Sequence, residues 1–321
     1  MSSPPFTITN KILKYISEIQ EILGEMKPLS ASKPAVKLRK ENKIKTIHHS
    51  LAIEGNSLTE QQITDILDEK RVLGPQKQIT EVKNALKVYD TIYNYESHSE
   101  KDFLSAHKIL MNGLIDAPGK YRTQSVGIFK EGQVSKIAPP AKMVPQLMSD
   151  LFKFLKKDKA TLSLLKACIF HYELEFIHPF VDGNGRMGRL WQQKILMDIS
   201  PLFEYIPVES LIHKNQKKYY ASLEDSDRQG NSTRFLEFSL EMILKSLEEF
   251  GLNLIPKKPS INDRIEYALD KFADKNFSRK EYLQLYKNIS TATASRDLAQ
   301  AVAEKKLKLI GTKSKAKYKK I

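Results

Sequence analysis

Cysteine is almost absent from this sequence. The one cysteine among 321 residues, Cys168, excludes an internal disulfide bond, and its apolar surroundings are typical of a small buried side chain. The seven histidines follow no Cys/His spacing of the kind that binds structural zinc. Long apolar runs are missing too, because none reaches the ~18 residues that indicate a membrane span.

The start of the chain shows no secretory signal. The opening Met-Ser-Ser-Pro-Pro has neither the basic nor the apolar region of such a signal. With 41% hydrophobic and 28% charged residues, the composition is that of a soluble globular protein. A length of 321 residues suffices for one large domain and a small one. We therefore expect a cytoplasmic protein with no membrane contact.

Acidic residues are scarce toward the C-terminus. Residues 256–321 hold 17 Lys and Arg against 7 Asp and Glu, so they carry +10 of the formal net charge of +14. This asymmetry favours a basic appendage with an anionic partner, such as DNA or an acidic protein, over a uniformly basic enzyme. A solvated lysine-rich tail explains the charge equally well.

The most informative stretch is residues 178–189, which read HPFVDGNGRMGR. It follows an apolar run, Leu162–Ile177, that suits a buried helix, and Pro179 ends this helix. Apolar residues at helical spacing resume at Met187. The sequence thus predicts a helix–loop–helix connection in which the second helix begins at Gly183–Arg186.

This connection combines groups that suit a polyphosphate. Unpaired amides at a helix N-terminus favour an anion, and two arginines three residues apart present their guanidinium groups on one helical face. Asp182 is a ligand for Mg²⁺, and His178 is the side chain that exchanges a proton near pH 7. A glycine-rich helix connection with ordinary surface arginines would explain any two of these features, but not all of them together.

The stretch resembles the signature of the Fic (Fic/Doc) family, HPFx(D/E)GN(G/K)RxxR, at every fixed position. The matching residues are His178, Pro179, Phe180, Asp182, Gly183, Asn184, Gly185, Arg186 and Arg189. Members of this family mostly transfer AMP from ATP to a hydroxyl group of a protein. The signature covers twelve residues, and weaker similarities extend over most of residues 50–250.

The resemblance implies a role for each motif residue. ATP would be the substrate, with Gly183, Asn184, Gly185 and Arg186 at its inner phosphates, Arg189 at the γ-phosphate and Asp182 holding Mg²⁺. His178 would be the general base that takes the proton of the attacking hydroxyl.

A second segment, from Ser50 to Gly55, ends another predicted helix. Glu54 is a carboxylate near a helix C-terminus, where the helix dipole disfavours it unless a cation compensates. A solvated surface glutamate is the simpler interpretation of these residues alone. However, the segment resembles the (S/T)xxxE(G/N) inhibitory motif of many Fic proteins, formed here by Ser50 and Glu54. The resemblance implies that Glu54 pairs with Arg189 and keeps it from the γ-phosphate.

Residues 121–137 break the helical pattern and read as a β-hairpin with a turn near Gly132. The hairpin resembles the flap of Fic proteins, and the preceding Pro118–Arg122 resembles their PGxYR. The resemblance implies that a protein substrate docks on residues 125–137 by strand pairing. A purely structural hairpin is the alternative.

Two further residues are candidates for adenine contacts by the same resemblance. They are Tyr220 and Asp227, in the helix expected at Glu209–Glu224 and just after it. Aromatic residues at helical spacing more often belong to the core.

Residues 256–321 begin with a proline-rich linker, Pro256–Ser260. Three helices are expected at 261–272, 278–286 and 290–305, followed by two strands that flank Gly311. This order resembles a winged helix-turn-helix with a recognition helix from Ser290. Such modules bind DNA, but they also dock proteins.

We therefore expect a mainly α protein with a Fic-type helical core, a β-hairpin flap, an N-terminal inhibitory helix and a small α+β winged-helix domain. The expected parts are a helical region at 1–95, the catalytic core at 96–255 and the winged helix at 256–321. The expected function is an adenylyltransferase that modifies a Tyr, Ser or Thr hydroxyl of another protein or of itself. Removal of AMP by the same site, and a DNA-binding regulator that senses nucleotide, are the alternatives.

Overall fold

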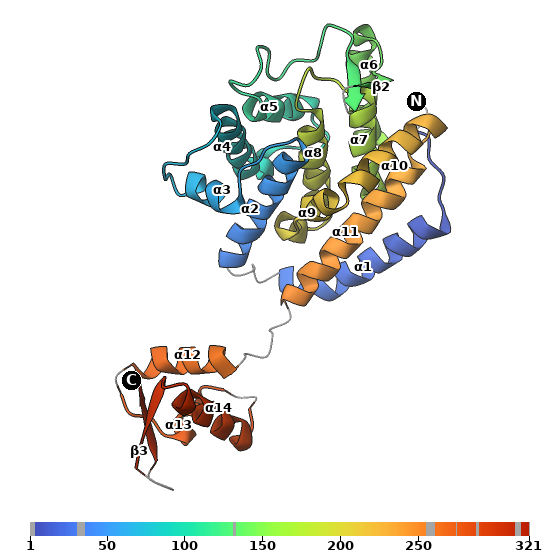
Figure 1. The fold of residues 1–321 in the computed structure, drawn as a ribbon. Coiled ribbons are helices and arrows are strands. Elements are labelled where there is room, and N and C mark those ends of the chain that lie inside the picture. The colour runs from blue at the N-terminus through green and yellow to red at the C-terminus, as the bar shows by residue number, and fades with distance from the viewer. Residues whose placement is uncertain are drawn as a thin grey trace. The chain divides into compact units, whose positions relative to one another are not determined.

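The computed structural model describes residues 4–30, 36–130, 133–254, 261–273, 275–286, 289–311 and 316–320 (Figure 1). The chain divides into two compact units, Met1–Gly251 and Leu252–Ile321. Residues 1–95 and most of 96–255, expected as separate parts, thus lie in one unit. The linker expected at Pro256–Ser260 lies outside the described residues.

The first unit is mainly helical, as expected. Its α-helices are α1 (Asn10–Ser30), α2 (Val36–Ile53), α3 (Glu60–Leu67), α4 (Gln76–Asp90), α5 (Glu100–Leu110), α6 (Val144–Lys157), α7 (Ser163–Ile177), α8 (Asn184–Ile199), α9 (Val208–Lys214), α10 (Gln216–Gln229) and α11 (Thr233–Leu254). Short 3₁₀ turns are η1 (Ile92–Asn94), η2 (Ala141–Met143) and η3 (Pro201–Tyr205). No helix in the described part of the chain is both long and apolar enough to cross a membrane.

Helices α7 and α8 run through the middle of this unit (Figure 1). Residues from Leu164 to Tyr172 of α7 are buried on every side of the helix, which explains its uninterrupted apolar sequence. Trp191, at the centre of α8, is fully buried and donates a hydrogen bond to the carbonyl of Ser97. The loop between α7 and α8 is therefore held at both ends by core helices.

The predicted hairpin is present as β1 (Gly127–Lys130) and β2 (Gln133–Ile137). The strands pair antiparallel, Gly127 with Ile137 and Lys130 with Gln133, with an irregularity between Ile128 and Phe129. The two strands form a sheet of their own. The centre of the turn, residues 131–132, lies outside the described residues.

Helix α1 lies along α11, far from it in sequence (Figure 1). The amide of Ser232, just before α11, donates to the carbonyl of Pro5, and Thr9 donates to the Glu237 carboxylate at 2.8 Å. Ile12 and Ile19 of α1 are fully buried. The N-terminal segment is thus part of the core of the first unit.

The second unit contains α12 (Ile261–Phe272), α13 (Arg279–Gln284), α14 (Thr291–Ala303), and the antiparallel strands β3 (Leu307–Ile310) and β4 (Lys317–Lys320). Elements of these types occur in the order that the sequence predicts. Their core includes Phe277, Tyr282 and Leu298.

One ion pair is buried inside this small core. Arg264 donates to both carboxylate oxygens of Asp297, at 2.6 and 2.8 Å, and the Tyr282 hydroxyl donates to Asp297 at 3.0 Å. Only 1% of the Asp297 side chain is exposed. The pair ties α12 to α14 and fixes which face of α14 is turned inward.

Substituting Asp297→Ala is expected to destabilise the second unit by about 3–5 kcal/mol, because the buried guanidinium of Arg264 loses both of its bonds to this carboxylate. In a unit this small, a loss of that size abolishes cooperative folding. Thermal unfolding and limited proteolysis of the whole chain measure the effect. Glu304→Ala, which removes a partly exposed pair with Lys306, should leave the stability almost unchanged. Equal effects of the two substitutions on stability would contradict the stabilising role of the Arg264–Asp297 pair.

Candidate active site

The loop between α7 and α8 is built around a buried phenylalanine and an asparagine. Phe180 is fully buried and stacks on the His107 ring at a centroid distance of 3.5 Å. The Asn184 side chain accepts from the Phe180 amide and donates to the Phe180 carbonyl, both at 2.9 Å. Asn184, expected at the inner phosphates, thus uses its side chain to close the loop. Its backbone amide remains at the helix N-terminus.

His107 of α5 contacts this loop, although its local sequence did not indicate such a role. The Gly119 amide donates to its Nδ1 at 2.8 Å, so Nε2 carries the proton and donates to the Asp182 carbonyl at 3.0 Å. Burial lowers the pKa of His107 to about 4. A neutral imidazole therefore holds the main chain next to the expected metal ligand.

Position 183 requires glycine because of its backbone conformation and a close neighbour. Its φ of +90° is a conformation that favours glycine, and a Cβ atom there would lie 2.7 Å from Met111 Sδ. The residue is the N-cap of α8. The predicted start of the second helix is therefore confirmed.

Arg122 anchors the start of the loop and the base of the hairpin. Its guanidinium donates to the carbonyls of His178, Gln124, Pro139 and Ile177, at 2.7, 3.0, 2.6 and 3.3 Å. Only 3% of the residue is exposed. These bonds satisfy carbonyls at the C-terminus of α7, which would otherwise have no partner within the helix.

Substituting Arg122→Ala is expected to destabilise the first unit by about 3 kcal/mol, because several buried carbonyls lose a charged donor at once. Urea unfolding should show a lower midpoint with an unchanged slope. The exposed neighbour Lys120 provides the control, since Lys120→Ala should leave the midpoint in place. A wild-type midpoint for the Arg122 variant would contradict the anchoring role.

His178 lies at the mouth of the loop as the C-cap of α7. Its backbone is left-handed, with φ 49° and ψ 60°, and its amide donates to the Leu174 carbonyl. The side chain is partly exposed. A left-handed cap turns the chain sharply at this point, so the imidazole belongs to the loop rather than to the core face of α7.

Asp182 and Arg186 form one side of the loop. Arg186 Nη2 donates to Asp182 Oδ1 at 2.8 Å, and the Gly183 amide donates to the same oxygen at 2.6 Å. Burial by itself raises the pKa of Asp182, but Arg186 and the Gly183 amide outweigh it and the pKa is lowered. The side chain is 43% exposed. The carboxylate is therefore ionised and accessible, and both hydrogen bonds end on the same oxygen. Such a carboxylate fits Mg²⁺, which takes one or two carboxylates together with phosphate oxygens.

The first turn of α8 faces the same loop. Its amides, from Asn184 to Arg186, have no carbonyl partner within the helix, because the Met187 amide is the first to bond back, to Gly183. Amides of this kind bind phosphate oxygens. The structure thus brings together the predicted base, metal ligand, amides and first arginine in one loop.

Arg189 lies one turn further along α8 and is held by α2. Its Nη2 donates to Glu54 Oε1 at 2.7 Å and to the Ser50 carbonyl at 2.9 Å, while Nε donates to Ser50 Oγ at 3.2 Å. The Arg189 side chain is 1% exposed, and Glu54 is 34% exposed. Burial lowers the pKa of a guanidinium, but the Glu54 carboxylate outweighs this and the pKa of Arg189 is raised. The pairing of Glu54 with Arg189 that the sequence predicts is present.

Gly185 makes room for this pair. A Cβ atom at position 185 would lie 2.3 Å from Glu54 Oε1 and 3.2 Å from Arg189 Nη1. Any larger residue would therefore push the Glu54 carboxylate away from the helix. The second glycine of the motif thus serves the contact with α2 as well as the approach of a ligand.

A second contact links the end of α2 to Arg186. Asn56, just after α2, donates to Glu81 Oε2 at 2.8 Å, and Arg186 Nη1 donates to Glu81 Oε1 at 3.3 Å. Glu81 of α4 therefore neutralises Arg186 together with Asp182. Neither Asn56 nor Glu81 was expected from the sequence, because Asn56 is 25 residues from Glu81 and Glu81 is 105 residues from Arg186.

The candidate adenine residues lie on α10 in different surroundings. Tyr220 is 38% exposed, and its hydroxyl lies 3.4 Å from the Ile53 carbonyl at the end of α2. Asp227 accepts from the Tyr172 hydroxyl of α7 at 3.0 Å. Tyr220 is thus near the expected nucleotide position, and its adenine contact stays a prediction.

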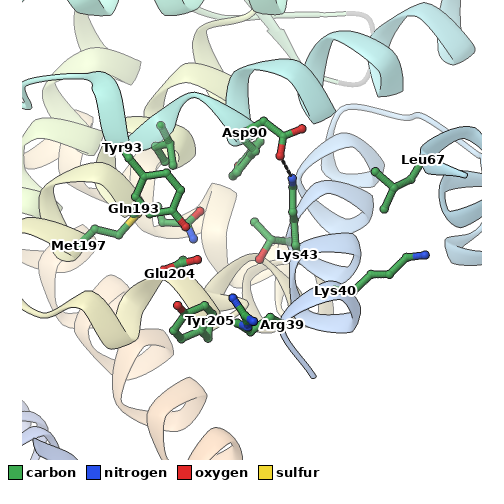
Figure 2. A pocket seen from close by; sticks show the side chains of 13 residues that line it. Arg39, Lys40, Lys43, Leu67, Asp90, Tyr93, Gln193, Met197, Glu204 and Tyr205 are labelled. Atoms are coloured by element: carbon green, nitrogen blue, oxygen red, sulfur yellow. Dashed lines mark hydrogen bonds and ion pairs between the residues drawn. The ribbon is translucent and has the colours of Figure 1, made fainter. Parts of the chain in front are cut away.

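A pocket of about 340 Å³ lies beside α2, away from the loop (Figure 2). Arg39, Lys40 and Lys43 of α2 contribute to its lining, and Lys43 forms an ion pair with Asp90 of α4. Further lining comes from α3, α8 and η3. Residues 178–189 are not among the described residues that line it, so this pocket is separate from the candidate active site.

Comparison with known proteins gives three similarities. Residues 97–196 match the Fic/DOC family. The crystal structure of a Fic family protein from Desulfovibrio desulfuricans G20 has a TM-score of 0.79 and 38% identity, covering 100% of this chain and 98% of that chain. Protein adenylyltransferase fic-1 of Caenorhabditis briggsae is 30% identical over 223 residues, which are 65% of this chain and 42% of that protein. The chain thus spans less than half the length of that curated relative.

The fold, the loop and these similarities agree with one another. The match to the Desulfovibrio structure extends over nearly the whole of both chains. The matched family region includes residues 178–189, which carry the family's signature at every position. This chain therefore belongs to the Fic family.

Proposed function

We propose that this protein transfers AMP from ATP to a hydroxyl group of a protein. The observation that carries the proposal is the convergence of His178, the Asp182 carboxylate and the first turn of α8 in one loop. The relatives named protein adenylyltransferase support the same reaction.

In this reaction the α- and β-phosphates of ATP lie against the amides at the start of α8 and Arg186. Arg189 receives the γ-phosphate once Glu54 has left it. His178 accepts the proton of the attacking hydroxyl, whose oxygen forms a bond to the α-phosphorus. The bond from the α-phosphorus to the bridging oxygen breaks, and pyrophosphate leaves.

Asp182 would hold Mg²⁺ in this complex, and the ion would supply neutralisation of the phosphate charge. The chain's own contribution is mainly positioning and charge, with general base catalysis adding about 10²–10⁴-fold. The lowered pKa of Asp182 keeps the carboxylate ionised for this role.

Helix α2 inhibits the reaction in this proposal. Because Glu54 and Ser50 hold Arg189, the γ-phosphate meets an arginine that is already neutralised. ATP then binds in a pose whose α-phosphorus is not aligned for attack. The hairpin β1–β2 is the proposed docking site of the protein substrate, since its strands leave edges to which an extended segment can pair.

Removal of AMP from a modified protein is the alternative reaction of the same site, with Glu54 orienting a water molecule. Two incubations distinguish them: Glu54→Gly, in which Arg189 is released, with α-labelled ATP and cell lysate, and the wild-type protein with a previously modified target. Label entering protein supports transfer. Release of AMP from the target without any transfer would replace the proposal by its alternative.

For the second unit, we propose a winged-helix module that binds an anionic partner such as DNA. Residues 256–321 carry a net charge of +10. Arg296 on α14 is exposed, as are Lys308 of β3 and Lys319 and Lys320 of β4. A mobility shift with duplex DNA that weakens steeply with salt supports DNA binding. Absence of any shift at low salt would leave a protein-docking role instead.

A further inference from the structure

Two histidines of α2 and a glutamate of α3 form a cluster that the reaction does not use. One ring nitrogen each from His48 and His49 and one carboxylate oxygen of Glu60 lie within 4.8 Å of one another. All three residues are partly buried. The sequence gives no sign of this cluster, because the histidines are adjacent and the glutamate lies in another helix.

The spacing of His48 and Glu60 suits two ligands of one ion. His48 Nδ1 lies 3.6 Å from Glu60 Oε1, which is too long for a strong hydrogen bond. Two ligands at about 2.1 Å from a tetrahedral Zn²⁺ are roughly 3.4 Å apart. His48 Nδ1 is buried and has no hydrogen-bond partner within the described part of the chain.

The second histidine is oriented by its other ring nitrogen. His49 Nδ1 lies 2.8 Å from the Lys45 carbonyl and 3.0 Å from the Ser210 hydroxyl. A carbonyl only accepts, so Nδ1 carries the proton and Nε2 keeps its lone pair. Metal-binding histidines commonly donate their other N–H to a backbone carbonyl in this way.

A third imidazole and a stable helix start complete the surroundings. The His213 ring of α9 lies 5.3 Å from the His49 ring, centroid to centroid. Glu60 is the first residue of α3, whose capping box is formed by Thr59 and Gln62 instead. Glu60 is thus available as a ligand without loss of the cap.

We propose that His48, His49 and Glu60 form a binding site for a divalent transition metal of the Zn²⁺ class. Imidazole nitrogens with one carboxylate suit this class better than Mg²⁺, which prefers oxygen. The fourth position is open to water or to His213.

Such an ion would join α2 to α3 next to the residues that hold Arg189. His49 directly precedes Ser50, and Glu54 lies one turn further along the chain. Binding would therefore restrict the opening of α2. This consequence concerns helix mobility and does not depend on the reaction that the protein catalyses.

The test is titration of the whole chain, without a polyhistidine tag, with Zn²⁺ alone and with Co²⁺ alone. We expect one saturable site and, for Co²⁺, the visible absorption of a tetrahedral complex. Glu60→Gln and His48→Gln should each weaken Zn²⁺ binding at least tenfold. Hydrogen exchange of α2 amides should slow on adding Zn²⁺ in the wild type and not in Glu60→Gln.

The matched control is His98→Gln. His98 pairs with Glu96 at 3.4 Å on another part of the surface, so this change removes an imidazole–carboxylate pair and should leave the affinity unchanged. Circular dichroism establishes that each variant is folded. Equal Zn²⁺ affinity in the wild type and both site variants, or no saturable binding at all, would overturn the proposal.

Discussion

Substituting Glu54→Gly is expected to raise the incorporation of label from α-labelled ATP into the protein itself by about tenfold or more. A hydrogen bond to a charged group contributes about 1.5–3 kcal/mol, and each 1.4 kcal/mol is a factor of ten. Glu54 is partly exposed, so the lower end of this range applies. Removing its carboxylate leaves Arg189 Nη2 and the neighbouring Nη1 available to a γ-phosphate.

The control for this result is the double variant Glu54→Gly with His178→Ala. In this double variant Arg189 is also released from Glu54, but the general base is missing, so the incorporation of label should be lost again. Glu54→Asp adds a second comparison, because it keeps the charge on a side chain too short to reach Arg189. Equal labelling of Glu54→Gly and the wild type would remove the basis for inhibition by α2.

The second expected result is the loss of AMP transfer in His178→Ala, by about 10²–10⁴-fold, with ATP binding retained. Retention is expected because the phosphate-binding groups are the amides of α8 and the two arginines. Transfer is measured with labelled ATP in the Glu54→Gly background, and binding by calorimetry.

Position 178 needs a second variant, because its left-handed backbone strains alanine. Asparagine tolerates this conformation, so His178→Asn should fold normally and also be inactive. Arg122 bonds to the carbonyl of residue 178, not to its side chain, and this anchor is present in both variants. If both folded variants kept wild-type transfer, His178 would not be the base.

Several local features could be predicted because short-range rules decide them. The end of a helix within Ser50–Gly55 is confirmed, with Gly55 in the left-handed region. So is the start of α8 at the motif. Each depends on backbone geometry and on side chains within a few residues, which the sequence displays directly.

The parts that could not be predicted depend on contacts between distant segments. His107, Arg122 and Glu81 reach the loop from α5, from the segment before β1 and from α4. Nothing in their local sequence distinguishes a buried, bonded side chain from a surface one. The side chain of Asn184 illustrates the same limit, because its bonds to Phe180 appear only once the loop is folded.

The sequence by itself determined the twelve-residue motif, the glutamate just after α2 and the order of helices and strands in the second unit. These follow from residue types and spacing along one chain segment. Only the tertiary structure decided that Glu81 and Asp182 both bind Arg186 and that His48 and His49 gather around Glu60. Hydrogen bonds and ion pairs act over a few ångströms, so partners separated by dozens of residues are selected by packing and not by the linear order of the chain.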